Sequence, residues 1–463
     1  MAAVTARHWD VLVVGAGPVG TLLAGAVARH GASVLVLERE TDIPDQTRAS
    51  TLNARSMEIM SSLHVPGLAG WPRSMMGHYG GLPVSLEEID SPWAGLWRMP
   101  QPDLVRLLRE WAVASGAVVR TGVAFTQAHA LPSAMLSRNA AGEAYESRFL
   151  VGADGADSAV SANLGFTPLG VAATRHMIRC DVKGVTIAPR RFEWHGDMVV
   201  TAGAISSAIT RLMLYSPRYS ATDTPTFEDV CRDWLEATGE RVDGDECVWL
   251  DQFSNGCSTV AKWDEGNVFL AGDAAHDQPP VGGSSLNAGL QDAHNLAWKL
   301  TALLGGAPGG LAATYGLERA EATATMQESV REQEALIFGA DRQRGGTVCD
   351  HMARSASFRR RIARWVSGLD THYMGSTQTG PRISPARLAR ALGRTLLPSE
   401  EAALGQQAII VVGDRAEDVL LVVRPDGHVA WVPGHPRTGA ADVITRWFGD
   451  FLKPVVMNAS TRD

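Results

Sequence analysis

The sequence predicts an α/β protein, because two short apolar strands are each followed by a glycine-containing loop and a helix. The first strand, near the N-terminus, leads into GAGPVG and then into an apolar helix. The second, VFLAGD, begins at residue 268 and is followed by Pro-Pro, Gly-Gly and a long helical pattern. Strand–glycine loop–helix units bind phosphate-containing ligands in α/β sheets. Both segments therefore point to a nucleotide-type cofactor.

The N-terminal segment matches a dinucleotide-binding fingerprint in each part. A buried strand over residues 10–14 precedes Gly15, Gly17 and Gly20, which fit G-x-G-x-x-G. In this pattern the first glycine makes the tight turn, the second admits a pyrophosphate, and the third allows close packing of the helix on the strand. A second strand, SVLVLE, ends at Glu38, whose carboxylate would take ribose hydroxyls. Such an acid favours NAD or FAD because it repels the 2′-phosphate of NADP.

The distant segment decides between these two cofactors. Gly272 and Asp273 end the strand VFLAGD. A carboxylate there suits the hydroxyls of a ribityl chain, and free N–H groups at the start of the next helix attract negative charge. An NAD-dependent dehydrogenase has no need of a second sugar-binding strand so far along the chain. The two segments together therefore predict FAD.

Composition narrows the function classes. The 463 residues are 45% hydrophobic and 20% charged, with a formal net charge of −8. A nucleic-acid binder carries a basic face, so we expect no nucleic-acid partner, and we interpret the basic cluster FRRRIARW as a solvated helix face or an internal anion contact. No apolar run is long enough to span a membrane, and no group of side chains suggests a metal site. The five cysteines form no C-x-x-C pair and no secretory signal is evident, so free thiols in the cytoplasm are expected.

Four separate motifs resemble the single-component flavoprotein aromatic hydroxylases, the p-hydroxybenzoate hydroxylase family. They are VLVVGAGPVG with LERE, RASTLNARSMEIM, LVGADGADSAV, and GDAAH followed by PP, GG and GLQDA. The segment MPQPDLVRLLREWA also resembles the family's glutamine-led helix. The branch that acts on polyketides and phenols is the most similar. The resemblance and the glycine segments assign FAD contacts to Gly15, Gly17, Gly20, Glu38, Arg39, Arg48, Gln101, Asp154, Gly272, Asp273, Pro280, Gly283, Ser284, Ser285, Leu286 and Asn287.

The resemblance also implies three domains. An FAD-binding Rossmann-type domain is expected over residues 1–74, 101–165 and 258–370, and a β-sheet substrate domain over residues 75–100 and 166–257. A thioredoxin-like domain is expected over residues 371–463, where AIIVVG, DVLLVVRPDGHVAWV and ADVITRWFGDFL predict a strand, a hairpin turning at RPDG and a helix. This domain contains no cysteine, so we expect it to serve packing or to form a homodimer rather than to perform dithiol chemistry.

The function implied by the resemblance is oxygen transfer. NADH or NADPH would dock transiently and reduce FAD, and oxygen would then enter a bulky, apolar, polyketide-like substrate by hydroxylation or Baeyer–Villiger-type insertion. Pro280, Gly282 and Asn287 would form the catalytic loop at the flavin edge, without a general base, and N–H groups of residues 284–287 would stabilise negative charge there. The Trp- and Met-rich segments SPWAGLWRMP and RFEWHGDM are expected to line the substrate pocket or to pack in the core.

Two departures from the family pattern open a second possibility. Ser284 and Ser285 stand where the family loop has a glutamine and a glycine, and Ser161 stands where the Asp-Gly motif usually continues to an arginine. Loss of that arginine weakens the case for reduction by a nicotinamide donor. The alternative is a redox-neutral cyclase that forms a decalin ring by [4+2] reaction in spirotetronate or spirotetramate biosynthesis, with FAD as a structural cofactor. Its pocket would act by preorganising a folded polyene.

Overall fold

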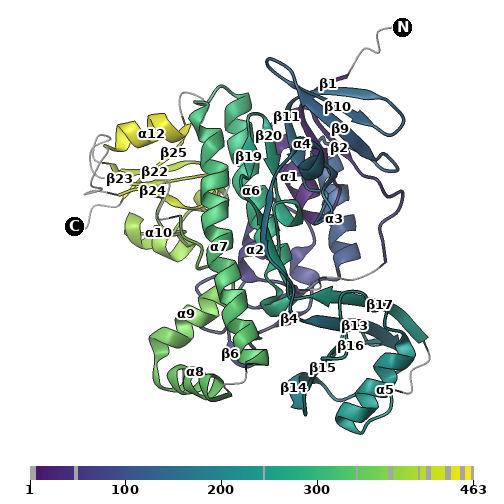
Figure 1. Cartoon of the computed structure of the whole chain (residues 1–463). Coiled ribbons are helices and arrows are strands. Elements are labelled where there is room, and N and C mark those ends of the chain that lie inside the picture. The colour runs from purple at the N-terminus through teal and green to yellow at the C-terminus, as the bar shows by residue number, and fades with distance from the viewer. Residues whose placement is uncertain are drawn as a thin grey trace.

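A computed structural model describes residues 7–45, 49, 51–242, 246–339, 342–373, 379–404, 407–412, 419–432, 439–448 and 454–459. The chain is a mixed α/β protein whose parts are arranged around one long helix, α7 (Gly310–Phe338) (Figure 1). All five cysteines lie in the described ranges and are free thiols, as expected. The domain boundaries themselves stay predictions.

The first unit is built on an eight-stranded sheet with the order β19-β20-β11-β1-β2-β8, extended from β11 by β10 and β9. Its strands are β1 (Arg7–Val14), β2 (Val34–Leu37), β8 (Val118–Arg120), β9 (Phe125–Ala130), β10 (Met135–Asn139), β11 (Ala144–Gly152), β19 (Asp264–Glu265) and β20 (Val268–Leu270). The central strands are parallel and their apolar residues are buried, which explains the unbroken apolar runs in the sequence. The strands predicted at residues 10–14 and 33–38 are confirmed.

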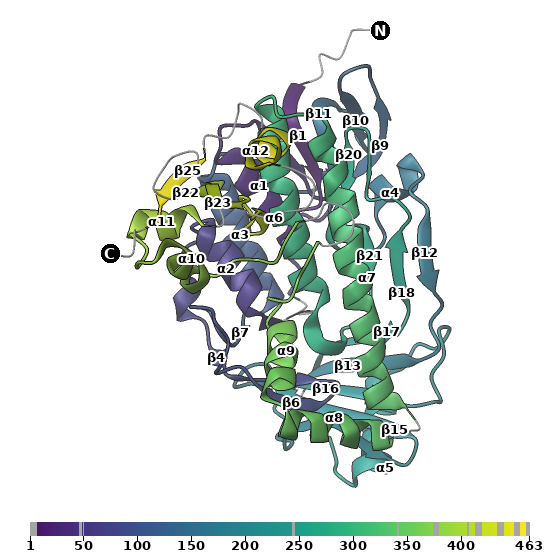
Figure 2. The ribbon, with the colours of Figure 1, turned by 90° about the vertical axis from the view of Figure 1, so that its left-hand side faces the viewer.

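Helices cover this sheet and complete its βαβ unit. They are α1 (Pro18–Ala28), α2 (Ala54–Ser62), α3 (Gln101–Ala114), α4 (Ala159–Leu164) and α6 (Ser285–Leu304). Helix α1 packs against both α3 and α6, and Figure 2 shows α6 beside α7. Because α1 and α6 each follow a glycine loop, their contact brings the two cofactor segments of the sequence together.

The second unit is a five-stranded antiparallel sheet with the order β14-β15-β16-β13-β17. Its strands are β13 (His176–Lys183), β14 (Arg190–His195), β15 (Met198–Ala204), β16 (Ile209–Tyr215) and β17 (Glu246–Ser254). Helix α5 (Phe227–Thr238) covers one face, where Trp234 is fully buried among apolar strand residues. A three-stranded sheet of β12 (Pro168–Val171), β18 (Cys257–Val260) and β21 (His276–Asp277) connects this unit to the first.

Several short strands lie between the two larger sheets. They are β3 (Thr51–Leu52), β4 (Arg73–Ser74) and β7 (Leu96–Arg98), which form one small sheet, and the hairpin of β5 (Met76–Tyr79) and β6 (Leu82–Ser85). The hairpin packs against α9 (Ala356–Val366), which follows α8 (Arg342–Arg354). The basic cluster FRRRIARW lies on α9, where Arg359, Arg360 and Arg361 are exposed, so the helix-face interpretation holds for these three.

Helix α7 contacts the first unit near its start and the second unit near its end. Its 29 residues span about 43 Å. Near its start the Tyr315 hydroxyl donates to the carbonyl of Leu270 at 2.7 Å, and near its end Ile337 accepts a hydrogen bond from the Trp194 indole at 2.7 Å. Helix α7 therefore helps, with the β12–β18–β21 sheet, to fix the position of the second sheet relative to the first.

The C-terminal unit has a four-stranded mixed sheet with the order β24-β23-β22-β25. Its elements are α10 (Pro385–Leu392), α11 (Pro398–Ala403), β22 (Ile409–Val412), β23 (Val419–Val423), β24 (Val429–Trp431), α12 (Ala440–Phe448) and β25 (Val455–Asn458). The predicted hairpin is confirmed, and Gly427 of RPDG has a φ of +79°, which glycine adopts without strain.

A buried charge cluster joins the C-terminal unit to the first. Arg424 donates to both carboxylate oxygens of Glu318 on α7, at 2.5 and 2.9 Å, and also pairs with Asp426. Lys299 of α6 donates to Glu318 at 2.8 Å. All four side chains are almost fully buried. Because buried charges are tolerated only when paired, this cluster makes docking of the C-terminal unit specific.

We predict that Arg424→Met destabilises the protein by about 3–5 kcal/mol, because it leaves two buried carboxylates with less compensation. Urea unfolding at neutral pH measures the change. Arg360→Met is the control, since Arg360 is 62% exposed beside Glu88, and its effect should stay within about 0.5 kcal/mol. Equal stability of Arg424→Met and wild type would show that the cluster does not hold the unit in place.

The cluster also predicts how this difference depends on pH. Burial alone would raise the pKa of Glu318, but Arg424 and Lys299 outweigh it and lower the pKa to about 2. A lowered folded-state pKa contributes stability that is complete above the ordinary value of 4.5 and is lost as the pH falls toward 2. The stability difference between wild type and Arg424→Met should therefore shrink when unfolding is repeated at pH 4. A difference that grows on acidification would contradict this account.

Candidate active site

Three glycines shape the N-terminal loop, and each has a different role. Gly15 has a φ of +101°, and a methyl group built on it would lie 2.3 Å from the carbonyl oxygen of Ala153. A methyl group on Gly20 would lie 2.1 Å from the carbonyl oxygen of Gly15. A methyl group on Gly17 would meet nothing within 4 Å. Gly15 and Gly20 are therefore required by packing, whereas Gly17 leaves open space at the start of α1, where a ligand can approach the backbone.

The Glu38 carboxylate is fixed at the end of β2. It accepts hydrogen bonds from the backbone N–H of Ala16 at 2.8 Å and of Glu40 at 3.0 Å. Arg109 of α3 donates to the Ala16 carbonyl at 2.9 Å and lies 3.6 Å from Glu38. Sequence reasoning missed Arg109, although it stands in the quoted segment MPQPDLVRLLREWA, because its distance from the glycine loop hides the contact. Arg39 forms an exposed pair with Glu40 at 3.2 Å.

The second cofactor segment meets the first through Val19. A methyl group built on Gly272 would lie 3.0 Å from the Val19 side chain, and one built on Gly289 would lie 2.7 Å from it. Gly272 has a φ of +63° and its N–H donates to Asp292 at 3.0 Å. The adjacent Asp273 is exposed in the turn that follows β20. The contact places Asp273 beside the start of α1, as one elongated cofactor requires.

Asn287 holds in place the loop at residues 280–287, which the sequence predicts to lie at the flavin edge. Its side-chain oxygen accepts from the N–H of Asn53 at 2.9 Å and from the Ser56 hydroxyl at 2.6 Å. Its amide nitrogen donates to the carbonyls of Gly283 at 2.8 Å and Thr51 at 3.2 Å. The side chain is buried and its polar atoms are occupied by protein groups, so the geometry gives Asn287 a positioning role.

The rest of the loop is shaped by glycine backbone and a buried glutamine. Gly282 and Gly283 have φ values of +75° and +64°. A methyl group on Gly282 would lie 2.9 Å from the Gln333 side chain of α7, so this face of the loop is closely packed. Pro280 is exposed at the turn before them.

The two unusual serines have different surroundings. The Ser285 hydroxyl accepts from the Gln278 amide at 2.9 Å. The Ser284 hydroxyl is buried, and among the described residues it has no hydrogen-bond partner. It lines a cavity at the start of α6, where no side chain caps the helix and the first N–H groups of the helix have no intrahelical acceptor. An unpaired buried hydroxyl beside free N–H groups suits a ligand with hydrogen-bonding edges, and Leu286 lies in the same first turn.

The Asp-Gly motif caps a helix. Asp154 accepts from the Ser158 hydroxyl at 2.6 Å and from the N–H of Ala159 at 2.7 Å, so its carboxylate holds the start of α4. Burial raises the pKa of Asp154 despite these hydrogen bonds. Ser161 lies in the first turn of α4, half-buried. Gln101 accepts a hydrogen bond from the N–H of Ala49 at 3.1 Å. Arg48 lies outside the described residues.

A buried polar chain supports the loop from behind. His276 lies 2.9 Å from Asp292, which also accepts from Arg319 of α7 at 2.5 Å. Burial would lower the pKa of His276, but the charge of Asp292 and the hydrogen bond to it, together with Asp273 and Gln278, outweigh burial and raise the pKa. The other ring nitrogen of His276 lies 3.2 Å from the Gln278 oxygen, which connects the chain to Ser285. The chain fixes the segment between β20 and α6 without exposing a titrating group.

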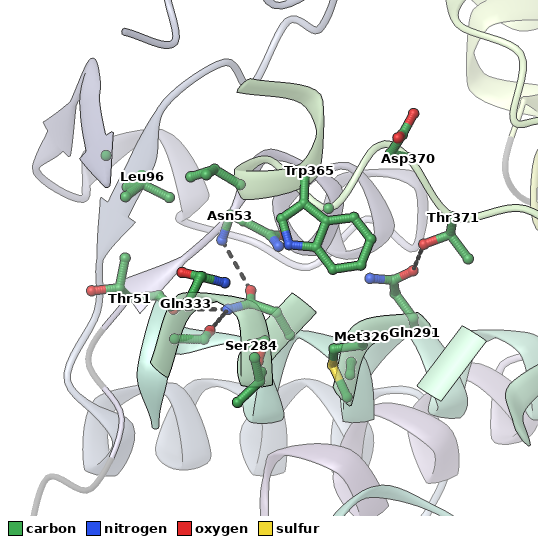
Figure 3. A pocket seen from close by; sticks show the side chains of 18 of the residues that line it. Thr51, Asn53, Leu96, Ser284, Gln291, Met326, Gln333, Trp365, Asp370 and Thr371 are labelled. Atoms are coloured by element: carbon green, nitrogen blue, oxygen red, sulfur yellow. Dashed lines mark hydrogen bonds between the residues drawn. The ribbon is translucent and has the colours of Figure 1, made fainter. Parts of the chain in front are cut away.

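A cavity of about 620 Å³ lies next to this loop (Figure 3). Its lining comes from α6, α7, α9 and the short strands between the sheets, and Figure 3 shows Ser284, Met326 and Trp365 around it. The tryptophans of SPWAGLWRMP and RFEWHGDM are not among its lining residues; Trp93 packs on Trp97, and Trp194 on Phe338. For these tryptophans the core-packing alternative is correct. The charged lining residues, which the sequence did not single out, are Arg73, His78, Arg98, Arg191, Arg319, Glu321, Asp370 and His372.

The described ranges contain no gathering of three His, Cys, Asp or Glu side chains suited to a metal ion. None of the helices in those ranges combines the length and apolar character needed to cross a membrane.

Comparison with known proteins identifies the family. Residues 8–330 match a family described as an FAD binding domain. The sequence is 30% identical to a rifampicin monooxygenase of Streptomyces venezuelae, over 95% of this chain and 99% of that protein. The protein belongs to the FAD-dependent monooxygenase family.

Two further relatives cover nearly the whole length of this chain. A solved aromatic hydroxylase from angucycline biosynthesis superposes with a TM-score of 0.83 at 28% identity, covering 96% of this chain and 99% of that one. A dialkyldecalin synthase of Streptomyces rugosporus is 28% identical over 95% of this chain and 98% of that protein. The p-hydroxybenzoate hydroxylase-like fold predicted from the motifs is thereby confirmed.

The residues of the monooxygenase-family protein fit FAD. Gly17 leaves room for a pyrophosphate, Glu38 offers a carboxylate at the ribose position, and Asp273 lies where the second segment joins the first. The unpaired Ser284 hydroxyl and the start of α6 offer donors for a flavin edge. FAD is therefore the cofactor of this protein, and the individual contacts stay predictions.

We predict that Gly17→Val folds normally but raises the Kd for FAD at least about tenfold, which is ~1.4 kcal/mol. The added side chain has free space in the protein and would occupy the room left for the pyrophosphate. FAD titration of the apoprotein and thermal melting measure the two effects separately. Gly20→Ala should instead lower the melting temperature of the apoprotein, and unchanged FAD affinity in Gly17→Val would exclude the proposed phosphate position.

We predict opposite patterns for the two serines. Ser284→Ala removes a hydroxyl that has no described partner, so apoprotein stability should change by less than about 0.5 kcal/mol while FAD affinity falls. Ser285→Ala loses the hydrogen bond to Gln278 and should cost about 1 kcal/mol in the apoprotein. Urea unfolding with and without FAD measures both. Wild-type FAD affinity in Ser284→Ala would mean that this hydroxyl does not contact the cofactor.

Proposed function

We propose that this protein is an FAD-dependent monooxygenase that inserts one oxygen atom into a bulky, apolar, polyketide-like intermediate, with NADH or NADPH as the transient reductant. The observation that carries the proposal is the cavity of about 620 Å³ bordered directly by Gly282, Gly283 and Ser284. The cavity therefore adjoins the loop where the flavin edge is expected. The named activities of the rifampicin monooxygenase and the angucycline hydroxylase support it.

Bound FAD supplies the oxygen chemistry, in which two electrons from the nicotinamide donor leave one oxygen atom in the product and the other in water. The protein's own part is to bind, orient and shield. The first N–H groups of α6 favour negative charge at the flavin edge. Asn287 holds the loop at a fixed distance from α2, and Met326, Val330 and Trp365 give the cavity apolar walls.

The test is anaerobic reduction of the purified holoenzyme. NADH or NADPH should bleach the flavin absorbance near its visible maximum, and in air the same mixture should consume oxygen when substrate is present. Dithionite is the control, because it reduces the flavin without a nicotinamide site. If dithionite bleaches the flavin and neither nucleotide does, the monooxygenase proposal fails.

The structure also favours testing a second function, a redox-neutral [4+2] cyclase with FAD as scaffold. The specific observation is the loop itself, where Ser284 and Ser285 replace residues of the family pattern, together with Ser161 in α4. The dialkyldecalin synthase relative supports this alternative. In that case the cavity walls would accelerate the cyclisation by holding a linear polyene in a folded conformation.

A matched pair of variants separates the two functions. Ser161→Arg restores the family's cation, and we expect it to speed flavin reduction by the nicotinamide donor if the protein is a monooxygenase. Ser161→Met has similar bulk without the charge and should leave the rate unchanged. A protein that is not reduced even with Ser161→Arg, and that cyclises a linear polyene with oxidised flavin, is a cyclase.

A further inference from the structure

Two arginines of the cavity have no acid partner. Arg98 on β7 and Arg191 on β14 both line the cavity, and neither forms a hydrogen bond or ion pair through its side chain with any described residue. Arg73, the third arginine near β7, is held over the ring of Trp97 with its guanidinium 5.4 Å from the ring centre. The neighbouring Arg190 shows the usual situation, since it pairs with Glu193 at 2.6 Å and with Glu240 at 2.7 Å.

The backbone of β14 is deformed at Arg191. The pairing of β14 with β15 shifts register between Arg190 and Glu193, so the strand has a bulge there. Phe192 within the bulge has a φ of +51°, which is strained for a residue with a side chain, and its N–H donates to the Thr201 hydroxyl at 3.0 Å. Bulges redirect side chains at functional sites. This one turns two consecutive arginines in different directions, one toward the carboxylates and one toward the cavity.

The hairpin strand β5 connects the two unpaired arginines. A methyl group built on Gly77 would lie 3.3 Å from Leu96, which is on the same face of β7 as Arg98 because alternate strand residues share a face. The next residue, His78, contacts the ring of Phe192 at 5.7 Å between centres. Arg98 and Arg191 therefore flank β5 on one side of the cavity.

Within the described part of the chain, no acidic side chain forms an ion pair with Arg98 or Arg191. Of the acidic lining residues, Asp370 is paired with Arg364 at 3.3 Å and lies 3.6 Å from His372. Figure 3 shows Asp370 on the opposite side of the cavity from Leu96. Burial, and next the charge of Arg191, lower the pKa of His78 to about 4, so this imidazole is neutral at pH 7. Arg98 and Arg191 are both solvent-exposed at the cavity. Partial burial of the Arg191 guanidinium still lowers its pKa.

We propose that Arg191 and Arg98 form a binding site for an anionic group, a carboxylate or an enolate, at one end of an otherwise apolar substrate. A guanidinium matches such an oxygen pair with two parallel hydrogen bonds, and a substrate that fills the cavity would shield this ion pair from water. The apolar walls at Leu96, Val330 and Trp365 would hold the rest of the molecule. This inference rests on the proposed function only in taking the cavity as the substrate site.

The test compares two probes on the oxidised holoenzyme, anthraquinone-2-carboxylate and the neutral anthraquinone-2-carboxamide. Binding is measured by the change in the flavin absorption spectrum. We expect the carboxylate to bind about tenfold or more tighter than the amide. Arg191→Met and Arg98→Met should each remove roughly tenfold of carboxylate affinity and leave amide affinity unchanged. Arg232→Met on the outer surface of α5 is the control and should change neither.

Arg191→Lys keeps the charge without the forked geometry, so it should recover part of the carboxylate preference. Thermal melting and flavin content show whether each variant is folded, and Arg191→Lys keeps the test valid if Arg191→Met unfolds. The inference is overturned if wild-type protein binds the carboxylate no tighter than the amide, including the case where it binds neither.

A second source of anionic groups is the nicotinamide donor, which carries a pyrophosphate. The KM for NADH and NADPH is therefore measured in the same variants. If Arg191→Met raises this KM and leaves probe binding unchanged, the arginines serve the donor and the substrate-anion site is wrong. Probe binding needs no flavin reduction, so the two proposals are tested independently. The probes can show no carboxylate preference while NADPH still bleaches the flavin, which contradicts only the anion site. Conversely, the carboxylate preference can remain when no nucleotide reduces the flavin, which contradicts only the proposed function.

Discussion

The whole site depends on one close contact, in which the Val19 side chain of α1 packs against Gly272 and Gly289. Any side chain at either glycine would collide with Val19 or with neighbouring backbone. The contact therefore forces the first glycine loop and the strand–loop–helix at residues 268–304 to share one site, although about 250 residues separate them in the sequence. The sheet beneath them and helix α7 then determine the position of the second sheet, including Arg191, relative to the loop.

Sequence reasoning succeeded where a residue type is required by backbone geometry. Gly15 and Gly20 are sterically required, and their spacing, set between two strands and a helix and followed by Glu38, predicted the first unit. It failed where the role of a residue depends on what the fold brings next to it. RPDG is a good turn signal, yet the same four residues supply Arg424 and Asp426 to a buried ion cluster. The sequence did not predict a role for Arg191, because its position depends on a register shift in β14 that no local sequence pattern indicates.

The buried polar groups form a nearly continuous path from the C-terminal unit to the cavity. Arg424 pairs with Glu318, and the next residue on α7, Arg319, donates to the Tyr373 hydroxyl at 3.0 Å and to Asp292. Asp292 in turn holds Gly272 and His276. The C-terminal unit has no cysteine, but its docking is coupled through these hydrogen bonds to the segment predicted to shape the flavin edge.

The bulge in β14 has an evolutionary consequence. Arg190 and Arg191 are chemically identical neighbours with different tasks, one neutralised by carboxylates and one turned into the cavity. The different tasks of the two arginines are determined by the register of the strand and not by the identity of either side chain. Insertion or deletion of a single residue in β14 would exchange the two arginines or turn both away. Relatives that conserve every cavity residue type can therefore still diverge in ligand preference through strand length alone.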